Sequence, residues 1–230
     1  MKSQKDLIEN EGWDVLIILD SCRYDVFEEL VGKYLDNYHL EKVVSTVPQI
    51  YWTSTFTRYY DVTFYSSNSW VSTGNVRGGA LNKYFKNIVD VWYLGWDVSL
   101  GTVPPWNVNY YVMKNFTSDR KIISYLQPHG PWIGRHKLTV TSYSMIHLGV
   151  DVKLRPVIEK KGPEYMRQLY VDNLKLVLKY VSALLESLNG TVIITSDHGE
   201  YLGENGKYLH TPMDNSDILK VVPWCETWLN

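Results

Sequence analysis

Short, almost wholly apolar runs alternate with longer amphipathic stretches along this chain. The clearest run covers residues 13–20 and has the pattern of a strand that is buried on both faces of a parallel sheet. Further runs predict strands at 40–44, 62–66, 88–94, 121–126 and 191–195. Because strands that alternate with helices build α/β domains, the pattern predicts an α/β fold with a mostly parallel sheet.

Apolar residues at helical spacing predict helices at 23–35 and 163–188, and Pro48 suits the first turn of another helix at 48–60. The helix at 163–188 is expected to bury one stripe, formed by Met166, Leu169, Tyr170, Leu174, Val177, Leu178, Val181, Leu185 and Leu188. Residues 67–79 are rich in turn formers and predict a long loop. Residues 135–156 have weak periodicity and fit an insertion, a flap or an interface.

Length and composition favour one globular domain over residues 1–230, because 45% of the residues are apolar and 21% are charged. The formal net charge of −2 gives no long-range attraction to nucleic acid, so no nucleic-acid partner is expected. The polar N-terminus and the short apolar runs predict no signal peptide, no membrane span and a cytoplasmic location. Cys22 and Cys225 cannot form a disulfide scaffold.

Aromatic residues are unusually frequent, with 18 Tyr and 9 Trp. Side chains of this kind usually fill a core or line an interface, and a surface that stacks sugars or bases is the alternative. We expect most of them to be buried, and we expect a homo-oligomer that forms through an aromatic surface.

Acidic residues follow two of the predicted strands, at the edge of a parallel sheet where ligands gather. Asp20 follows the first strand, where a helix cap is the competing role for it and for Ser21. Asp197 and His198 follow the strand at 191–195, and a buried charged pair at this place is costly unless it binds something. Gly199 permits the turn that would bring both side chains to one divalent cation.

Two further histidines have a context that suggests chemistry. His210 lies close in sequence to Asp197 and His198 across a glycine-rich loop. His129 lies in the proline-flanked segment QPHGP, which fits either a rigid turn or a fixed contact to a ligand. The other histidines, at positions 39, 136 and 147, are expected to be ordinary. Asp and His ligands suit a cation such as Mn, Mg, Ca or Zn.

Several motifs occur in the order found in a known family. They are DSCRYD at 20–25, STVP at 45–48, QPHGP at 127–131, TSDHGEYLGE at 195–204, His210 and VVPW at 221–224. In this order the chain resembles the sulfatase-like branch of the alkaline phosphatase superfamily, and most of all its compact archaeal proteins, over residues 15–224. The SDHGExLGE segment is the most specific part of the resemblance.

The resemblance implies a three-layer sandwich, with a central sheet between helices and a metal at the strand ends. It implies that Asp20, Thr46, Asp197 and His198 are metal ligands, and that Thr46 is the nucleophile. His129 and His210 match histidines that contact the transferred group or a second metal.

Three departures from the family pattern change the expected chemistry. The nucleophile stretch is TVPQI and lacks the Cys and Arg of C-x-P-S-R, so the formylglycine of sulfatases cannot form at Thr46. Ser21 replaces the second of two aspartates after the first strand, and Tyr125 replaces an acidic residue before His129. We therefore expect one divalent cation, with a second one left open, and no sizeable C-terminal subdomain.

The expected function is that of a metal-dependent hydrolase or transferase that acts on phosphate esters through a covalent phospho-threonine at Thr46. The substrate is expected to be a small molecule or a phosphoester linked to a glycan or a lipid. His129 or His210 would protonate the leaving alcohol, and Arg23 or Lys207 would add positive charge. Ser45 and Thr53 are fallback nucleophiles. The alternatives are a sulfatase and a catalytically inactive binding protein.

Overall fold

The computed structural model describes residues 1–10, 12–45, 55–74, 81–117, 120–140, 148–210 and 214–229. Eight strands form one sheet in the order β1-β3-β10-β7-β2-β6-β4-β5. These strands are β1 Lys2–Ser3, β2 Val15–Leu19, β3 His39–Val44, β4 Tyr60–Tyr65, β5 Phe85–Val89, β6 Arg120–Tyr125, β7 Gly190–Ser196 and β10 Val221–Leu229. All neighbouring strands are parallel except β10, which is antiparallel to both β3 and β7.

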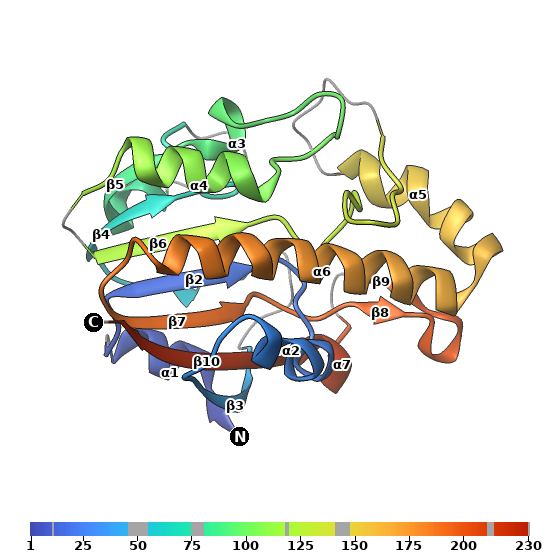
Figure 1. Cartoon of the computed structure of the whole chain (residues 1–230), viewed down its shortest axis with the longest axis horizontal. Helices are drawn as coiled ribbons and strands as arrows, with labels where there is room; N and C mark the ends of the chain where they lie inside the picture. Colours follow the sequence, from blue (N-terminus) through green and yellow to red (C-terminus); the bar gives the residue numbers. More distant parts are fainter. Residues whose placement is uncertain are drawn as a thin grey trace.

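Helices cover the sheet, and α6 crosses its face in the middle of Figure 1. The described helices are α1 Gln4–Glu9, α2 Tyr24–Leu30, α3 Val91–Leu94, α4 Pro105–Lys114, α5 Leu148–Lys161, α6 Pro163–Leu185 and α7 Asp217–Lys220. Short 3-10 turns lie at Val31–Lys33, Leu81–Tyr84 and Glu204–Gly206. A small hairpin of β8 Tyr201–Leu202 and β9 Tyr208–Leu209 follows β7. The predicted α/β architecture is confirmed.

The core is divided by the sheet into two clusters, and β2 contributes to both of them. Ile17 and Leu19 pack in the cluster under α2, α4 and α6, whereas Leu16 and Ile18 pack in the cluster that includes Ile8 of α1. This alternation explains why β2 is apolar at every position, since side chains of a strand point to opposite faces. The apolar stripe of α6 is buried as predicted.

Two predicted elements differ from the structure. The strand expected at 88–94 ends at Val89, and α3 begins at Val91 because Asp90 interrupts the run; its carboxylate accepts hydrogen bonds from the backbone N–H of Thr73 and from the Trp92 indole N–H at 3.0 Å. The helix expected at 48–60 lies mostly outside the described residues, and its described part leads into β4 without forming an α-helix. The sequence pattern did not predict α1, α4, α5 or β10.

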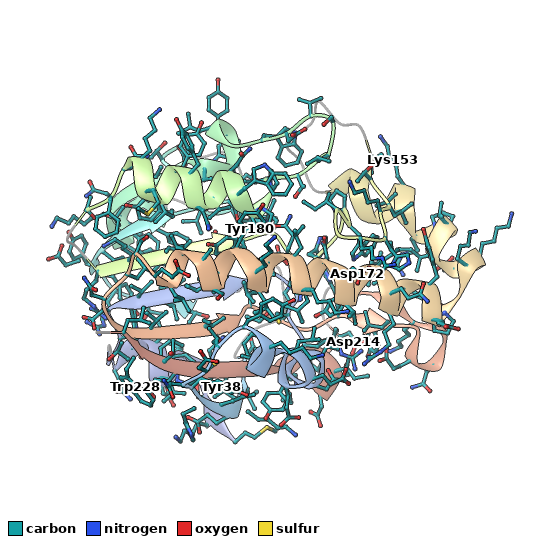
Figure 2. The ribbon with its side chains drawn as sticks, viewed as in Figure 1. Tyr38, Lys153, Asp172, Tyr180, Asp214 and Trp228 are labelled. Carbon is teal, nitrogen blue, oxygen red and sulfur yellow. The ribbon has the colours of Figure 1, made fainter. Side chains whose placement is uncertain are left out.

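About half of the described aromatic side chains are buried, which is fewer than expected, and a group of large apolar side chains on α3 and α4 is exposed. It consists of Tyr93, Leu94, Trp106, Tyr110 and Met113, together with Phe116 beyond the end of α4. Trp106 packs against Tyr180, with ring centroids 5.7 Å apart. Tyr180 is labelled on α6 in Figure 2. A homo-oligomer through this surface stays a prediction, which sedimentation equilibrium would test. Within the described ranges, none of the helices has the length and hydropathy that a membrane span requires.

Candidate metal centre

The carboxyl ends of β2, β6 and β7 meet at one edge of the sheet, where their arrowheads point in the same direction (Figure 1). Asp20 directly follows β2, and Asp197 and His198 directly follow β7. A backbone hydrogen bond joins the loop that follows β6 to this edge, because the N–H of His129 donates to the carbonyl of Asp20 at 3.1 Å. Residues far apart in sequence are therefore neighbours, as parallel topology requires.

The first ligand group consists of Asp20, Asp197 and His198, whose ligand atoms lie within 4.8 Å of one another. Nε2 of His198 lies 3.9 Å from Oδ1 of Asp20 and 3.7 Å from Oδ2 of Asp197. Two carboxylates and an imidazole that converge at this distance leave space for one divalent cation between them.

Hydrogen bonds aim these side chains at a common point. Nδ1 of His198 lies 2.8 Å from the carbonyl oxygen of Gly199, so it donates there and leaves the Nε2 lone pair available. Oδ1 of Asp197 accepts from the backbone N–H groups of Ser21 and His198, each at 2.9 Å, which leaves Oδ2 for a cation. Both arrangements are the ones that a metal ligand needs.

Ser21 stands at the centre of this group. Its backbone has a φ of +62°, a left-handed conformation that is uncommon outside glycine. Its hydroxyl donates to Oδ1 of Asp20 at 3.0 Å and lies 3.4 Å from Nδ1 of His198. The residue that replaces an acidic ligand of the family pattern therefore contacts two members of the ligand group.

Burial and crowding perturb the ionisation of all three residues. Burial, with the nearby charge of Asp197, raises the pKa of Asp20 to about 6, and burial also raises the pKa of Asp197. Burial, with the nearby His210, lowers the pKa of His198 to about 3. Buried carboxylates in contact disfavour each other's ionised form, and a divalent cation would relieve that cost. The donor set therefore fits a metal.

The second ligand group lies beside the first and consists of His129, Glu200 and His210. Glu200 is fully buried; its Oε1 lies 3.1 Å from Nδ1 of His210 and 3.8 Å from Nε2 of His129. Oε2 of Glu200 has no hydrogen-bond partner among the described residues. The rings of His198 and His210 have centroids 4.4 Å apart, so the two ligand groups are direct neighbours.

Comparison with known proteins identifies the fold, although neither a protein-family model nor a curated protein sequence matches the chain. The structure is similar to the soluble domain of lipooligosaccharide phosphoethanolamine transferase A from Neisseria meningitidis, with a TM-score of 0.58 at 15% identity over 94% of this chain and 76% of that one. It is also similar to a protein in the alkaline phosphatase superfamily from Vibrio parahaemolyticus, with a TM-score of 0.52 at 8% identity over 94% and 60% of the two chains.

The chain has an alkaline phosphatase-like fold. A third structure, the C-terminal periplasmic domain of EcEptC from Escherichia coli in a complex with Zn, has a TM-score of 0.50 at 14% identity and covers 94% of this chain and 72% of that one. Identities this low establish the fold and leave the activity to the residues of the site.

On this alkaline phosphatase fold, the structure brings Asp20, Asp197, His198, His129 and His210 together. Thr46 and the fallback nucleophile Thr53 lie outside the described residues. The other fallback, Ser45, is described: its hydroxyl donates to the carbonyl of Asp197 at 2.5 Å. His39 and His136 lie outside both ligand groups. His136 pairs with Asp172, which is labelled on α6 in Figure 2, at 2.6 Å. His147 is not among the described residues.

Glu200 was missed in the sequence, although it stands three residues after Asp197 in the Asp-His-Gly-Glu string. A glutamate in a turn is normally solvated, and only the converging histidines from positions 129 and 210 show its role. The sequence does hold a sign that Glu200 is buried. Its charged segment lies between a buried strand and the apolar residues Tyr201 and Leu202.

Gly199 is required by close packing against α7. A Cβ atom at this position would lie 2.0 Å from the carbonyl oxygen of Ile218, and the N–H of Gly199 donates to the carbonyl of Leu219 at 2.8 Å. We expect Gly199→Ala to lower the free energy of unfolding by about 1–3 kcal/mol and to weaken metal binding, because His198 must move with the turn. Urea unfolding and Zn²⁺ titration measure both effects. Gly12→Ala is the control, since nothing lies within 4 Å of its Cβ, and an equal loss there would contradict the prediction.

Arg23 links the segment that follows β2 to the segment that follows β7. Its charge is used in these contacts and is therefore not free for a substrate. Its guanidinium pairs with Asp25 at 2.7 Å and with Glu204, and donates to the carbonyl of Glu200 at 3.2 Å. Lys207 is paired too, with Asp214 at 2.9 Å. The two cations considered for charge stabilisation are therefore engaged in structural ion pairs.

These ion pairs predict acid sensitivity. Although burial opposes it, hydrogen bonds from Arg23 lower the pKa of Asp25 and of Glu204. Carboxyls with a lowered pKa stabilise the fold above their ordinary values near 4, and this stability is lost as the pH falls through the lowered values. We expect Arg23→Met to lower the free energy of unfolding by about 2 kcal/mol at pH 7. Below about pH 4 the difference in free energy of unfolding between the variant and the wild type is expected to become smaller. Thermal unfolding of the wild type and of Arg23→Met across this pH range measures the difference. A difference in stability that does not change with pH would contradict the prediction.

Proposed function

We propose that the protein is a metal-dependent enzyme that acts on phosphate esters and uses Thr46 as its nucleophile. The observation that supports this most directly is the convergence of Asp20, Asp197 and His198, whose ligand atoms lie within 4.8 Å of one another. The fold supports the same class, because similar structures include phosphoethanolamine transferase A and a Zn complex.

The proposed cation would be held by Asp20, Asp197 and His198, with Thr46 as a further ligand. When bound, a divalent cation supplies Lewis acidity and neutralises charge on a phosphoryl oxygen. Ser45, which precedes Thr46 in the sequence, donates its hydroxyl to the carbonyl of Asp197. The second ligand group supports the binding of either a second cation or the phosphoryl group.

In the proposed reaction the Thr46 hydroxyl passes its proton to solvent water and its oxygen attacks phosphorus, while the bond from phosphorus to the leaving oxygen breaks. His129 or His210 donates a proton to that leaving oxygen, so that the alcohol departs neutral. Water or an acceptor alcohol then attacks phospho-Thr46 and its proton passes to the same histidine. The bond from phosphorus to the Thr46 oxygen breaks, and this oxygen takes a proton back from solvent water. Glu200 orients His210 through the contact at 3.1 Å.

The proposed substrate is a phosphoester of a small molecule, a glycan or a lipid. A protein similar in fold acts, by its name, as a lipooligosaccharide phosphoethanolamine transferase, which supports a lipid- or glycan-linked substrate. The cytoplasmic location stays a prediction, and one similar structure is a periplasmic domain.

The test is turnover by the full chain, stripped of metal and then supplied with Zn²⁺, Mn²⁺, Mg²⁺ or Ca²⁺. We expect hydrolysis of p-nitrophenyl phosphate or bis-p-nitrophenyl phosphate that requires the cation, and no hydrolysis of p-nitrophenyl sulfate. Hydrolysis of the sulfate ester alone would favour a sulfatase. Absence of cation binding in calorimetry would leave the inactive binding protein as the better explanation.

A further inference from the structure

The face of α6 that packs against the sheet is apolar except at two fully buried positions, Tyr170 and Asn173. They are three positions apart, so their side chains leave the helix on the same side, about one turn apart. A buried polar group in the middle of a helix is costly unless its hydrogen bonds are made elsewhere. Both side chains make them with loops of the metal centre.

Tyr170 binds the loop that follows β2. Its hydroxyl donates to the carbonyl of Ser21 at 2.6 Å and accepts from the N–H of Arg23 at 2.8 Å. Ser21 has the left-handed backbone, donates its hydroxyl to Asp20, and donates its N–H to Asp197. One hydroxyl from α6 therefore fixes the turn that orients two carboxylates of the first ligand group.

Asn173 binds the loop that follows β6. Its Nδ2 lies 3.0 Å from the carbonyl oxygen of His129, and 3.2 and 3.3 Å from those of Pro128 and Pro131. Its Oδ1 accepts from the N–H of Ile133 at 2.9 Å. The amide therefore holds the backbone on both sides of His129, whose Nε2 faces Glu200 in the second ligand group.

We propose that Tyr170 and Asn173 are positioning residues: from one rigid helix they set where Asp20 and His129 stand relative to each other. The hydrogen bonds are features of the structure. The claim that the spacing of Asp20 and His129 matters for metal and phosphate binding rests on the proposed function. Neither residue touches a reacting atom in this arrangement, and each acts through one loop. The two loops can therefore be perturbed separately, one from each side chain.

The experiment is a pair of substitutions with two ligand titrations on the full chain. Zn²⁺ is titrated into metal-free protein, and inorganic phosphate into the Zn²⁺-loaded protein. We expect Tyr170→Phe to weaken Zn²⁺ binding at least about tenfold, the usual effect of losing a group that orients a ligand. We expect Asn173→Ala to leave Zn²⁺ affinity within about twofold and to weaken phosphate binding about tenfold, because His129 belongs to the second group.

Matched controls remove the same chemical groups elsewhere. Tyr65→Phe removes a buried hydroxyl that donates to the carbonyl of Asn115 at 2.6 Å, and Asn109→Ala removes an amide that donates to the carbonyl of Tyr180 at 2.8 Å. Both are expected to keep wild-type affinities for Zn²⁺ and phosphate. If Asn173→Ala does not fold, Asn173→Ser, which retains one donor, is expected to show a smaller loss of phosphate affinity.

The outcomes separate the two proposals. If the wild type binds no cation, the proposed function fails. If the wild type binds Zn²⁺ and phosphate and the variants at 170 and 173 behave like their controls, the positioning proposal is overturned and the proposed function stands. Equal weakening of both ligands by both variants would also overturn it, because that result indicates general destabilisation.

Discussion

Replacing Asp20 by asparagine is expected to abolish binding of the proposed cation and, in the same variant, to make the metal-free protein more stable. The carboxylate supplies a charged ligand beside Asp197 and His198, and an amide oxygen is a poor substitute for it. The amide still accepts the hydrogen bond from the Ser21 hydroxyl, which Asp20 accepts at 3.0 Å. The variant therefore loses the cation but keeps the hydrogen bond from Ser21.

The gain in stability follows from the raised pKa of Asp20, which moves from 3.8 to about 6. A carboxyl whose pKa is raised by folding contributes stability below its unfolded value, and that stability is lost as the pH rises through the folded value. At pH 7 the ionised Asp20 therefore costs about 3 kcal/mol, which corresponds to about 5–10 °C in the thermal midpoint of a domain of this size.

Differential scanning calorimetry of metal-free wild type and Asp20→Asn at pH 7 and pH 5 measures this effect. We expect the variant to unfold at the higher temperature at pH 7, and the difference to shrink at pH 5, where Asp20 is largely protonated. Asp61→Asn is the matched control, since that side chain is 72% exposed. Unchanged Zn²⁺ affinity in Asp20→Asn would contradict the proposed metal centre.

Replacing Thr46 by alanine is expected to lower the turnover of phosphate esters at least about a thousandfold, because the variant has no oxygen to form the covalent intermediate. Cation binding should survive in weakened form, since Asp20, Asp197 and His198 remain. Thr46→Ser is expected to keep part of the activity, because it retains the hydroxyl.

Mass spectrometry of the acid-quenched protein during turnover distinguishes the nucleophiles. We expect a phosphorylated peptide that contains Thr46 in the wild type and none in Thr46→Ala. Thr57→Ala is the matched control, because its hydroxyl bonds to Glu9 away from the site. Wild-type turnover in Thr46→Ala, with phosphate on Ser45 or Thr53, would identify one of the fallback nucleophiles instead.

The parts of the fold that sequence predicted are those with a simple burial pattern. β2 and β7 are buried on both faces and therefore nearly all apolar, and α6 has one uninterrupted stripe. β10 was missed because Pro223 and Glu226 break its apolar pattern, although it lies inside the sheet. α4 was missed because its exposed face has Trp106 and Tyr110 where polar residues are usual.

Some residues of the site could likewise be predicted from the sequence and others could not. Asp20, Asp197 and His198 follow recognisable strands, so their meeting at one edge is a consequence of topology that sequence can predict. The roles of Glu200, Tyr170 and Asn173 depend on contacts between distant segments. Tyr170 was assigned to the apolar stripe, which is correct for its ring and leaves out its hydroxyl. No pattern along the chain shows that its partner is the carbonyl of Ser21.

The place of β10 has a consequence for biosynthesis. Among the described strands, β3 and β1 connect to the rest of the sheet only through β10, which lies between β3 and β7. Along the chain β10 comes after every other described strand, so β3 stays unpaired with the central strands until β10 has been synthesised. A nascent chain therefore cannot complete this side of the sheet before β10 has left the ribosome.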